Sequence, residues 1–100
     1  MMKMSVYKNI RQWAKDRGIY EKSNPTLQFV KLQEETGELA SALLKNDIVA
    51  IVDAIGDSVI VLTNLAAMLD LNIEDCIDVA YDEIKDRKGK MDNGVFKKEL

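Results

Sequence analysis

The chain of 100 residues contains no histidine. This absence removes the usual general acid or base of enzymes and the commonest protein ligand of transition metals. The Glu-x-x-His pairs of di-iron helical bundles therefore cannot be built. Any bound metal ion must be held by oxygen ligands, which favours Mg²⁺, Mn²⁺ or Ca²⁺.

Cysteine and proline occur once each, as Cys76 and Pro25. A single cysteine excludes an internal disulfide framework and is typical of a reducing compartment, so we expect a cytoplasmic protein. Without a histidine partner, Cys76 is expected to be a small core residue rather than a nucleophile. Lys3, Lys8 and Arg11 interrupt the apolar residues near the N-terminus, so we expect no signal peptide.

The chain also lacks an excess of basic charge, because its formal net charge is −3. A nucleic-acid polymer is therefore not an expected partner. The apolar run over residues 48–69 is long enough to suggest a membrane span. However, Asp53 and Asp57 lie inside it, and each would cost about 2.5 to 3.5 kcal/mol at the centre of a bilayer. We expect no membrane span, and a composition of 47% hydrophobic and 31% charged residues is that of one ordinary globular domain over residues 1–100.

Apolar residues at helical spacing predict an all-α fold with four helices. The expected helices are a first that ends at Gly18, a second over about 25–45, a third from about 48, and a fourth with an apolar stripe over 73–84. Their short connections predict an antiparallel four-helix bundle, followed by an irregular tail from about residue 88. The third helix is apolar nearly all round, which indicates a subunit interface as well as a core, so we expect a homo-oligomer, a dimer or a tetramer.

Acidic residues border the apolar faces of the second and third helices. Glu35 lies beside the apolar face of the second helix, and Glu38 lies just off it, one turn further along. On the third helix, Asp53, Asp57 and Asn64 share one side. Burying ionised carboxylates is costly unless they are paired or bind a metal ion. Facing pairs of this kind would hold Mg²⁺ and leave ligand positions for phosphate and water. The simpler alternative is a solvated acidic face.

Two segments resemble a known family. Residues 31–39, KLQEETGEL, look like the Glu-Glu-x-x-Glu segment of the MazG-type all-α nucleoside triphosphate pyrophosphohydrolases. Residues 55–62, IGDSVIVL, resemble their second motif, in which Gly-Asp enters an aliphatic helix. The spacing of the motifs, the helix count and the length also agree, most closely with the short stand-alone MazG-like proteins of phages and bacteria.

The resemblance implies Mg²⁺-dependent cleavage between the α- and β-phosphates of a nucleoside triphosphate, with Mn²⁺ as a possible substitute. It implies that Glu35, Glu38 and Asp57 are metal ligands and that Glu34 binds a further metal ion or orients the attacking water. The second motif of the family usually has glutamate at the position of Ala54. Asp53, one turn before Asp57 on the same face, is the candidate replacement.

The candidate proton acceptors are Glu34 and Glu38. Further residues are candidates for contacts with the phosphates or the base of the substrate: Lys31, Asn64, Trp13, Tyr81, Lys85 and Arg87. For each lysine or arginine a solvated position is the alternative, and for Lys31 an ion pair with Glu35 at i, i+4. For the aromatic residues the alternative is a place in the core.

Two other functions remain open at this point. One is a phosphoribosyl-ATP pyrophosphatase-like enzyme, which shares a similar fold and acidic motifs. The other is a non-catalytic helical module that dimerises and regulates a partner, an alternative that Ala54 favours. Removal of damaged nucleotides and control of the nucleotide pool are both compatible with the sequence.

Overall fold

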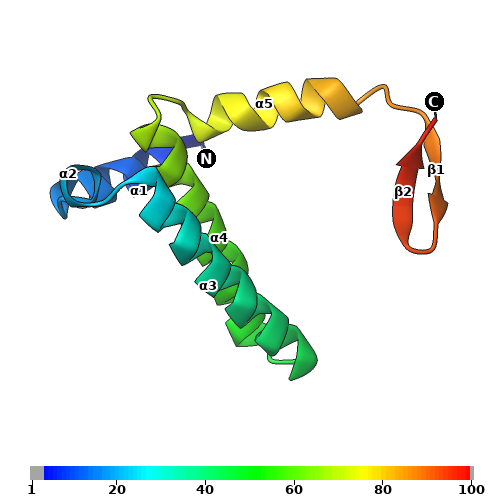
Figure 1. Ribbon diagram of the computed structural model, residues 1–100, viewed down its shortest axis with the longest axis horizontal. Helices are drawn as coiled ribbons and strands as arrows, with labels where there is room; N and C mark the ends of the chain where they lie inside the picture. Colours follow the sequence, from blue (N-terminus) through cyan, green and yellow to red (C-terminus); the bar gives the residue numbers. More distant parts are fainter. Residues whose placement is uncertain (1–3, 100) are drawn as a thin grey trace.

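The computed structural model describes residues 4–99 and is mostly helical (Figure 1). The elements are α1 (Met4–Asp16), α2 (Ile19–Lys22), α3 (Pro25–Leu44), α4 (Ile48–Met68), α5 (Ile73–Ile84), β1 (Gly89–Asp92) and β2 (Val95–Lys98). The predicted all-α character is confirmed. The short helix α2 was not predicted, and it arises because Gly18, at φ 76°, turns the chain between α1 and α2.

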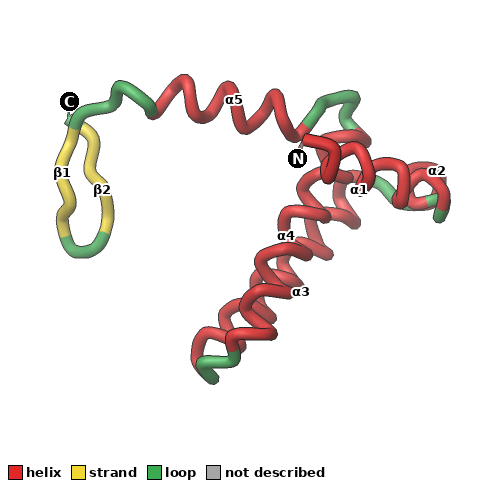
Figure 2. Tube along the Cα trace, turned by 180° about the vertical axis from the view of Figure 1, so that it is seen from behind, coloured by secondary structure: helices red, strands yellow, loops and turns green. Residues whose placement is uncertain are grey.

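The two long helices α3 and α4 form an antiparallel pair, and both views show them side by side (Figures 1 and 2). Each begins at a capping residue. The side chain of Asn24 accepts a hydrogen bond from the Leu27 amide at 2.9 Å, and that of Asp47 accepts one from the Ala50 amide at 3.2 Å. Such caps satisfy amide groups that the first turn of a helix leaves free. The pair is therefore defined at both N-termini by local sequence.

Helix α1 lies across the end of α4, where the best-buried residues of the protein gather. Ala14 of α1 is completely buried, as is Thr63 of α4, whose hydroxyl donates a hydrogen bond to the Val59 carbonyl at 2.7 Å. The remaining buried apolar residues are small: Ala42, Ala54, Val61 and Ala66. The core of one chain is thus thin.

Four helices do not close into a bundle within one chain. Only α3 lies along α4, whereas α5 leaves the end of α4 and points away from it (Figure 1). The radius of gyration is 16.1 Å, against about 13 Å for a compact domain of this length. The predicted bundle is therefore not present in the single chain, because α5 meets α1 and α4 only at its first turns.

The C-terminal tail is not irregular as predicted but forms an antiparallel hairpin of β1 and β2. Asn93 and Gly94 connect the strands with φ of 51° and 80°. Positive φ at both central residues is the type I′ geometry that matches the twist of a hairpin. A side chain at position 89 would collide with the Lys97 carbonyl and the Phe96 ring, so Gly89 lets the strands approach. The predicted core position of Cys76 is also wrong, because this residue is exposed on α5.

Candidate functional site

A groove of about 510 Å³ runs between α3 and α4 and is closed at one end by α1 and α2. It brings together residues from four helices that are far apart in the sequence. Its lining contains six of the predicted site residues: Trp13, Lys31, Glu34, Glu35, Asp57 and Asn64. The other lining residues are mostly apolar, among them Ile60 and Val61. Carboxylates from both walls, Glu34 and Glu35 of α3 and Asp57 of α4, thus lie among largely apolar side chains.

Glu35 is the most unusual side chain of the groove because it is charged and only 6% exposed. Its Oε1 atom lies 3.5 Å from Nζ of Lys31. Its Oε2 atom is buried and has no hydrogen-bond partner among the described residues. A buried carboxylate oxygen without a partner is unfavourable. The free Oε2 atom therefore marks a position where a cation or a hydrogen-bond donor would be strongly stabilised.

Lys31 is the cation of the groove lining. Its Nζ atom lies 3.8 Å from Glu34 Oε2, and the nearby charges of Glu34 and Glu35 raise the pKa of Lys31. The charge of Glu38 contributes to the same pKa shift. The simple ion pair between Lys31 and Glu35 is therefore present. Because half of the Lys31 side chain is exposed, this ion pair contributes little stability, and the lysine can be displaced from it.

Asp57 faces the groove from α4. Partial burial raises the pKa of its carboxyl group, and the negative charges of Asp53 and Glu35 raise this pKa further. Lys31 acts in the opposite direction. The charges of Glu35 and Asp57 thus act on one another across the groove, although the residues come from different helices. A cation placed between them would reverse this repulsion.

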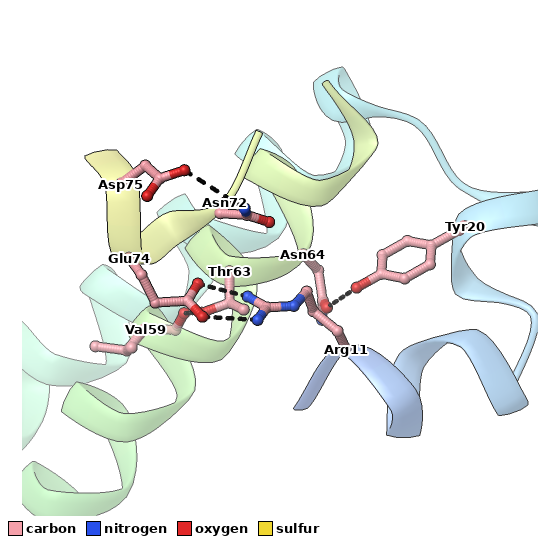
Figure 3. A network of polar contacts seen from close by, with 8 residues as sticks. All are labelled: Arg11, Tyr20, Val59, Thr63, Asn64, Asn72, Glu74 and Asp75. Carbon is pink, nitrogen blue, oxygen red and sulfur yellow. Dashed lines mark hydrogen bonds and ion pairs between the residues drawn. The ribbon is translucent and has the colours of Figure 1, made fainter. Parts of the chain in front are cut away.

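Asn64 is 3% exposed and is held by a residue that the sequence did not reveal. Tyr20 of α2 donates a hydrogen bond from its hydroxyl to Oδ1 of Asn64 at 2.7 Å (Figure 3). Burial raises the pKa of the Tyr20 hydroxyl, so it stays protonated and keeps donating. Nothing in the local sequence signals this contact, because Tyr20 and Asn64 are 44 residues apart.

The remaining predicted site residues lie outside the groove. Glu38 and Asp53 are exposed one turn away from Glu35 and Asp57 and do not line it. Ala54 is buried, so a larger side chain at this position would enter the packed helix pair. Three predicted substrate-binding residues lie on or just after α5, which points away from α3 and α4 (Figure 1): Tyr81, Lys85 and Arg87. Over residues 4–99, no three acidic or cysteine side chains converge closely enough to hold a metal ion.

Both walls of this groove fall within a match to a known family. The family model of the MazG nucleotide pyrophosphohydrolase domain matches residues 24–91. The chain belongs to the MazG family. The match covers α3, α4 and α5, and therefore Lys31, Glu34, Glu35, Asp57 and Asn64. Trp13, which lines the groove, and Tyr20, which holds Asn64, precede the matched MazG segment.

One relative of this MazG chain is an uncharacterised 18.2 kDa protein, from the rep-hol intergenic region of Haemophilus phage HP1. The two are 51% identical over 61 residues, which is 61% of this chain and 37% of the relative. The aligned stretch thus spans well under half of the phage protein. No solved structure matches the chain.

Proposed function

We propose that this MazG-family chain is a Mg²⁺-dependent pyrophosphohydrolase. It cleaves an NTP or dNTP between the α- and β-phosphates to give a nucleoside monophosphate and pyrophosphate. The observation that carries the proposal is the unpartnered, buried Oε2 atom of Glu35, which faces Asp57 across a groove. Such an arrangement is unfavourable for the fold alone, and a bound cation would make it favourable. Control of the cytoplasmic nucleotide pool is the role that fits this activity.

The donor set fits Mg²⁺, which prefers oxygen ligands and usually binds through one or two carboxylates together with substrate phosphates and water. Glu35 and Asp57 would hold the ion from the two walls of the groove. Glu38 and Asp53, one turn further along each helix, would supply further oxygens. The chemistry that a bound Mg²⁺ would supply is neutralisation of negative charge on the phosphates.

The side chains of the groove then divide the remaining work. Glu34 is exposed at the groove edge and accepts the proton of the attacking water. Lys31, released from its carboxylate partners, binds a phosphate oxygen. Asn64, which Tyr20 holds in place, donates a hydrogen bond from its side-chain amide to the substrate. The half-exposed ring of Trp13, which lines the groove, offers a stacking surface for the base.

We also propose that the active form is a homo-oligomer joined through α4. Five apolar residues of α4 follow the 4-3-4-3 spacing of a coiled-coil seam and are 37 to 67% exposed: Ile48, Val52, Ile55, Val59 and Leu62. By length and composition α4 is apolar enough to cross a membrane, with a mean hydropathy of 1.9. Asp53, Asp57 and Asn64 on this helix favour a protein partner over lipid.

The test incubates the full chain and Mg²⁺ with each NTP and dNTP, with dUTP and with phosphoribosyl-ATP, and separates the products by chromatography. We expect a monophosphate and pyrophosphate, with loss of turnover in Glu35→Gln. The matched control Glu21→Gln changes an exposed glutamate of α2 and should keep full activity. Diphosphate and orthophosphate as products would contradict the proposal, and a strong preference for phosphoribosyl-ATP would redefine the substrate.

A second candidate function is a non-catalytic dimerisation module. It is favoured by the lack of three converging metal-binding side chains within residues 4–99. This alternative predicts no hydrolysis and no change in melting temperature when Mg²⁺ or Mn²⁺ is added. The pyrophosphohydrolase instead predicts a rise in melting temperature that Glu35→Gln abolishes, because a ligand that binds only the folded state stabilises it.

A further inference from the structure

Helix α5 and the hairpin, residues 73–98, form an arm that projects from the rest of the protein (Figure 1). Its base is firmly placed, because the guanidinium of Arg11 donates two hydrogen bonds to the Glu74 carboxylate, both at 2.7 Å (Figure 3). This paired contact between α1 and the first turn of α5 gives the arm a defined direction away from α3 and α4. In the structure the hairpin therefore lies away from the groove of its own chain (Figure 1).

The surface of the arm has the properties of an interface. One chain exposes 7860 Å², whereas a compact monomer of this mass exposes about 5,700 Å². The excess is as large as one partner's share of an obligate dimer interface. On α5, an apolar stripe of heptad spacing lies unburied: Ile73, Ile77, Ala80 and Ile84. An isolated two-stranded hairpin is at best marginally stable in water, so this hairpin also needs a surface to pack on.

The two faces of the hairpin differ. Met91 pairs with Phe96 on one face, which is apolar. Lys90 pairs directly with Lys97 on the other face, where Asp92 also forms an exposed ion pair with Lys97 at 3.4 Å. Like charges directly opposite each other destabilise a hairpin, and the exposed carboxylate of Asp92 offsets only part of this repulsion, so an added phosphate would stabilise the pair. The apolar face is suited to a protein surface, and the lysine pair is suited to phosphate.

Charge divides the chain in the same way. Residues 87–99 carry five basic and two acidic side chains, a net charge of +3, so the rest of the chain carries −6. The groove lining holds three acidic side chains against the single cation Lys31. A triphosphate adds several negative charges to this surface. Apart from a bound Mg²⁺, the groove lining of one chain thus offers a triphosphate only Lys31, and further positive charge would strengthen binding.

We propose that the arm of each copy packs on a second copy of this chain and places Lys90 and Lys97 over that copy's groove, where they bind the terminal phosphates of the nucleotide. The inference rests on the proposed pyrophosphohydrolase function for the identity of the ligand. The packing of the arm on a second copy is inferred from the exposed apolar stripe of α5 and from the opposite charges of the hairpin and the groove. The active site is then complete only when two chains combine.

Cross-linking tests the packing without any need for activity. In a Cys76→Ser background, one copy carries Glu34→Cys in the groove and a second, larger tagged copy carries Lys97→Cys on the hairpin. We expect a short bismaleimide to join the two copies. Lys45→Cys, exposed at the other end of α3, is the matched control and should not be joined to the hairpin. Absence of the mixed product, or a monomer that binds phospholipid vesicles instead, would overturn the proposal.

Subunit mixing tests the phosphate contact. Lys90→Gln with Lys97→Gln removes both charges and their mutual repulsion, and it also removes the ion pair of Lys97 with Asp92. Because that pair is exposed and worth little, the hairpin itself should not be weakened. We expect kcat/KM to fall at least tenfold, mainly through KM. Mixing this variant with the inactive Glu35→Gln chain should restore hydrolysis, because one mixed site then has an intact groove and an intact hairpin.

The two tests separate the two proposals. A mixed cross-link without hydrolysis by the wild-type chain would support the packing of the arm on a second copy and refute the enzymatic function. Hydrolysis by the wild type, with no restoration of activity on mixing the two variants, would support the enzymatic function and refute the shared site.

Discussion

The region made of α1, α3 and α4 differs from the arm of residues 73–98 in burial and in charge. Every buried residue of the described chain lies in α1, α3 or α4, whereas α5 and both strands contain none. The first region carries acidic side chains on a groove, and the second carries basic side chains on a hairpin. The comparison indicates that one chain contains two incomplete halves, each with apolar surface and charge that the other would complement.

Asp57→Asn is expected to have the largest effect, because it removes an oxygen that faces the groove. The loss in kcat/KM should be about 100- to 1,000-fold, the scale seen when one group that stabilises transition-state charge is removed. Protons compete with Mg²⁺ for Asp57, and the raised pKa of this carboxyl group in the metal-free chain predicts that kcat/KM falls in acid at a higher pH than with an ordinary aspartate. A pH profile of kcat/KM for the wild type measures this decline in acid.

The same substitution should act on stability in the opposite sense. A raised carboxyl pKa in the folded state means that folding disfavours the ionised form, so the penalty is present above that pKa and disappears as the pH falls below it. Asp57→Asn should therefore raise the melting temperature at pH 7 without Mg²⁺, and the gain should vanish in acid. Unchanged stability at both pH values would contradict the assigned electrostatics.

Val61→Ala and Val79→Ala make the same chemical change in the two regions. Val61 is 6% exposed in α4, and its truncation should cost about 2 to 3 kcal/mol of unfolding free energy. Val79 is 68% exposed in α5, and its truncation should cost less than about 0.5 kcal/mol. Urea denaturation of both variants measures the difference. Equal costs would contradict the division of the chain into a packed region and an exposed arm.

Tyr20→Phe tests the hydrogen bond that positions Asn64 in the groove. It removes the hydroxyl that donates to Asn64 and leaves a buried amide oxygen without its partner, at a cost of about 1 to 2 kcal/mol. Because Asn64 is then less well positioned, kcat/KM should also fall severalfold, with less effect at Tyr7→Phe on α1 as the control. Full activity together with lost stability would assign Tyr20 a purely structural role.

Glu74→Gln tests the base of the arm and should have the smallest effect, about 1 kcal/mol. The hydrogen bonds from Arg11 lower the pKa of Glu74. A lowered folded pKa gives stability that is present above the unfolded pKa and is lost as the pH falls through the folded pKa. The wild type should thus lose this contribution in acid, whereas Glu74→Gln should lack it at every pH. Thermal denaturation from pH 3 to 7 compares them.

Local signals predicted the helices well. The breaks at Gly18, at Asn46-Asp47 and before Ile73 all lie where the structure ends or begins a helix, because capping side chains and positive φ act within a few residues. The hairpin was missed although its Asn93-Gly94 turn was visible. Four-residue strands with exposed side chains give too little periodicity to detect.

The candidate site divides in the same way. The sequence by itself determined the mostly helical class and the candidate carboxylates, since residue type and helical spacing decide these, and it predicts a metal held by oxygen ligands. Only the tertiary structure decided that Glu35 is buried with a free oxygen while Glu38 is exposed, and that Tyr20 meets Asn64. It also decided that α5 leaves the pair of long helices rather than completing a bundle. Burial and contacts between distant residues depend on how helices pack, and the periodicity of one helix does not contain that information.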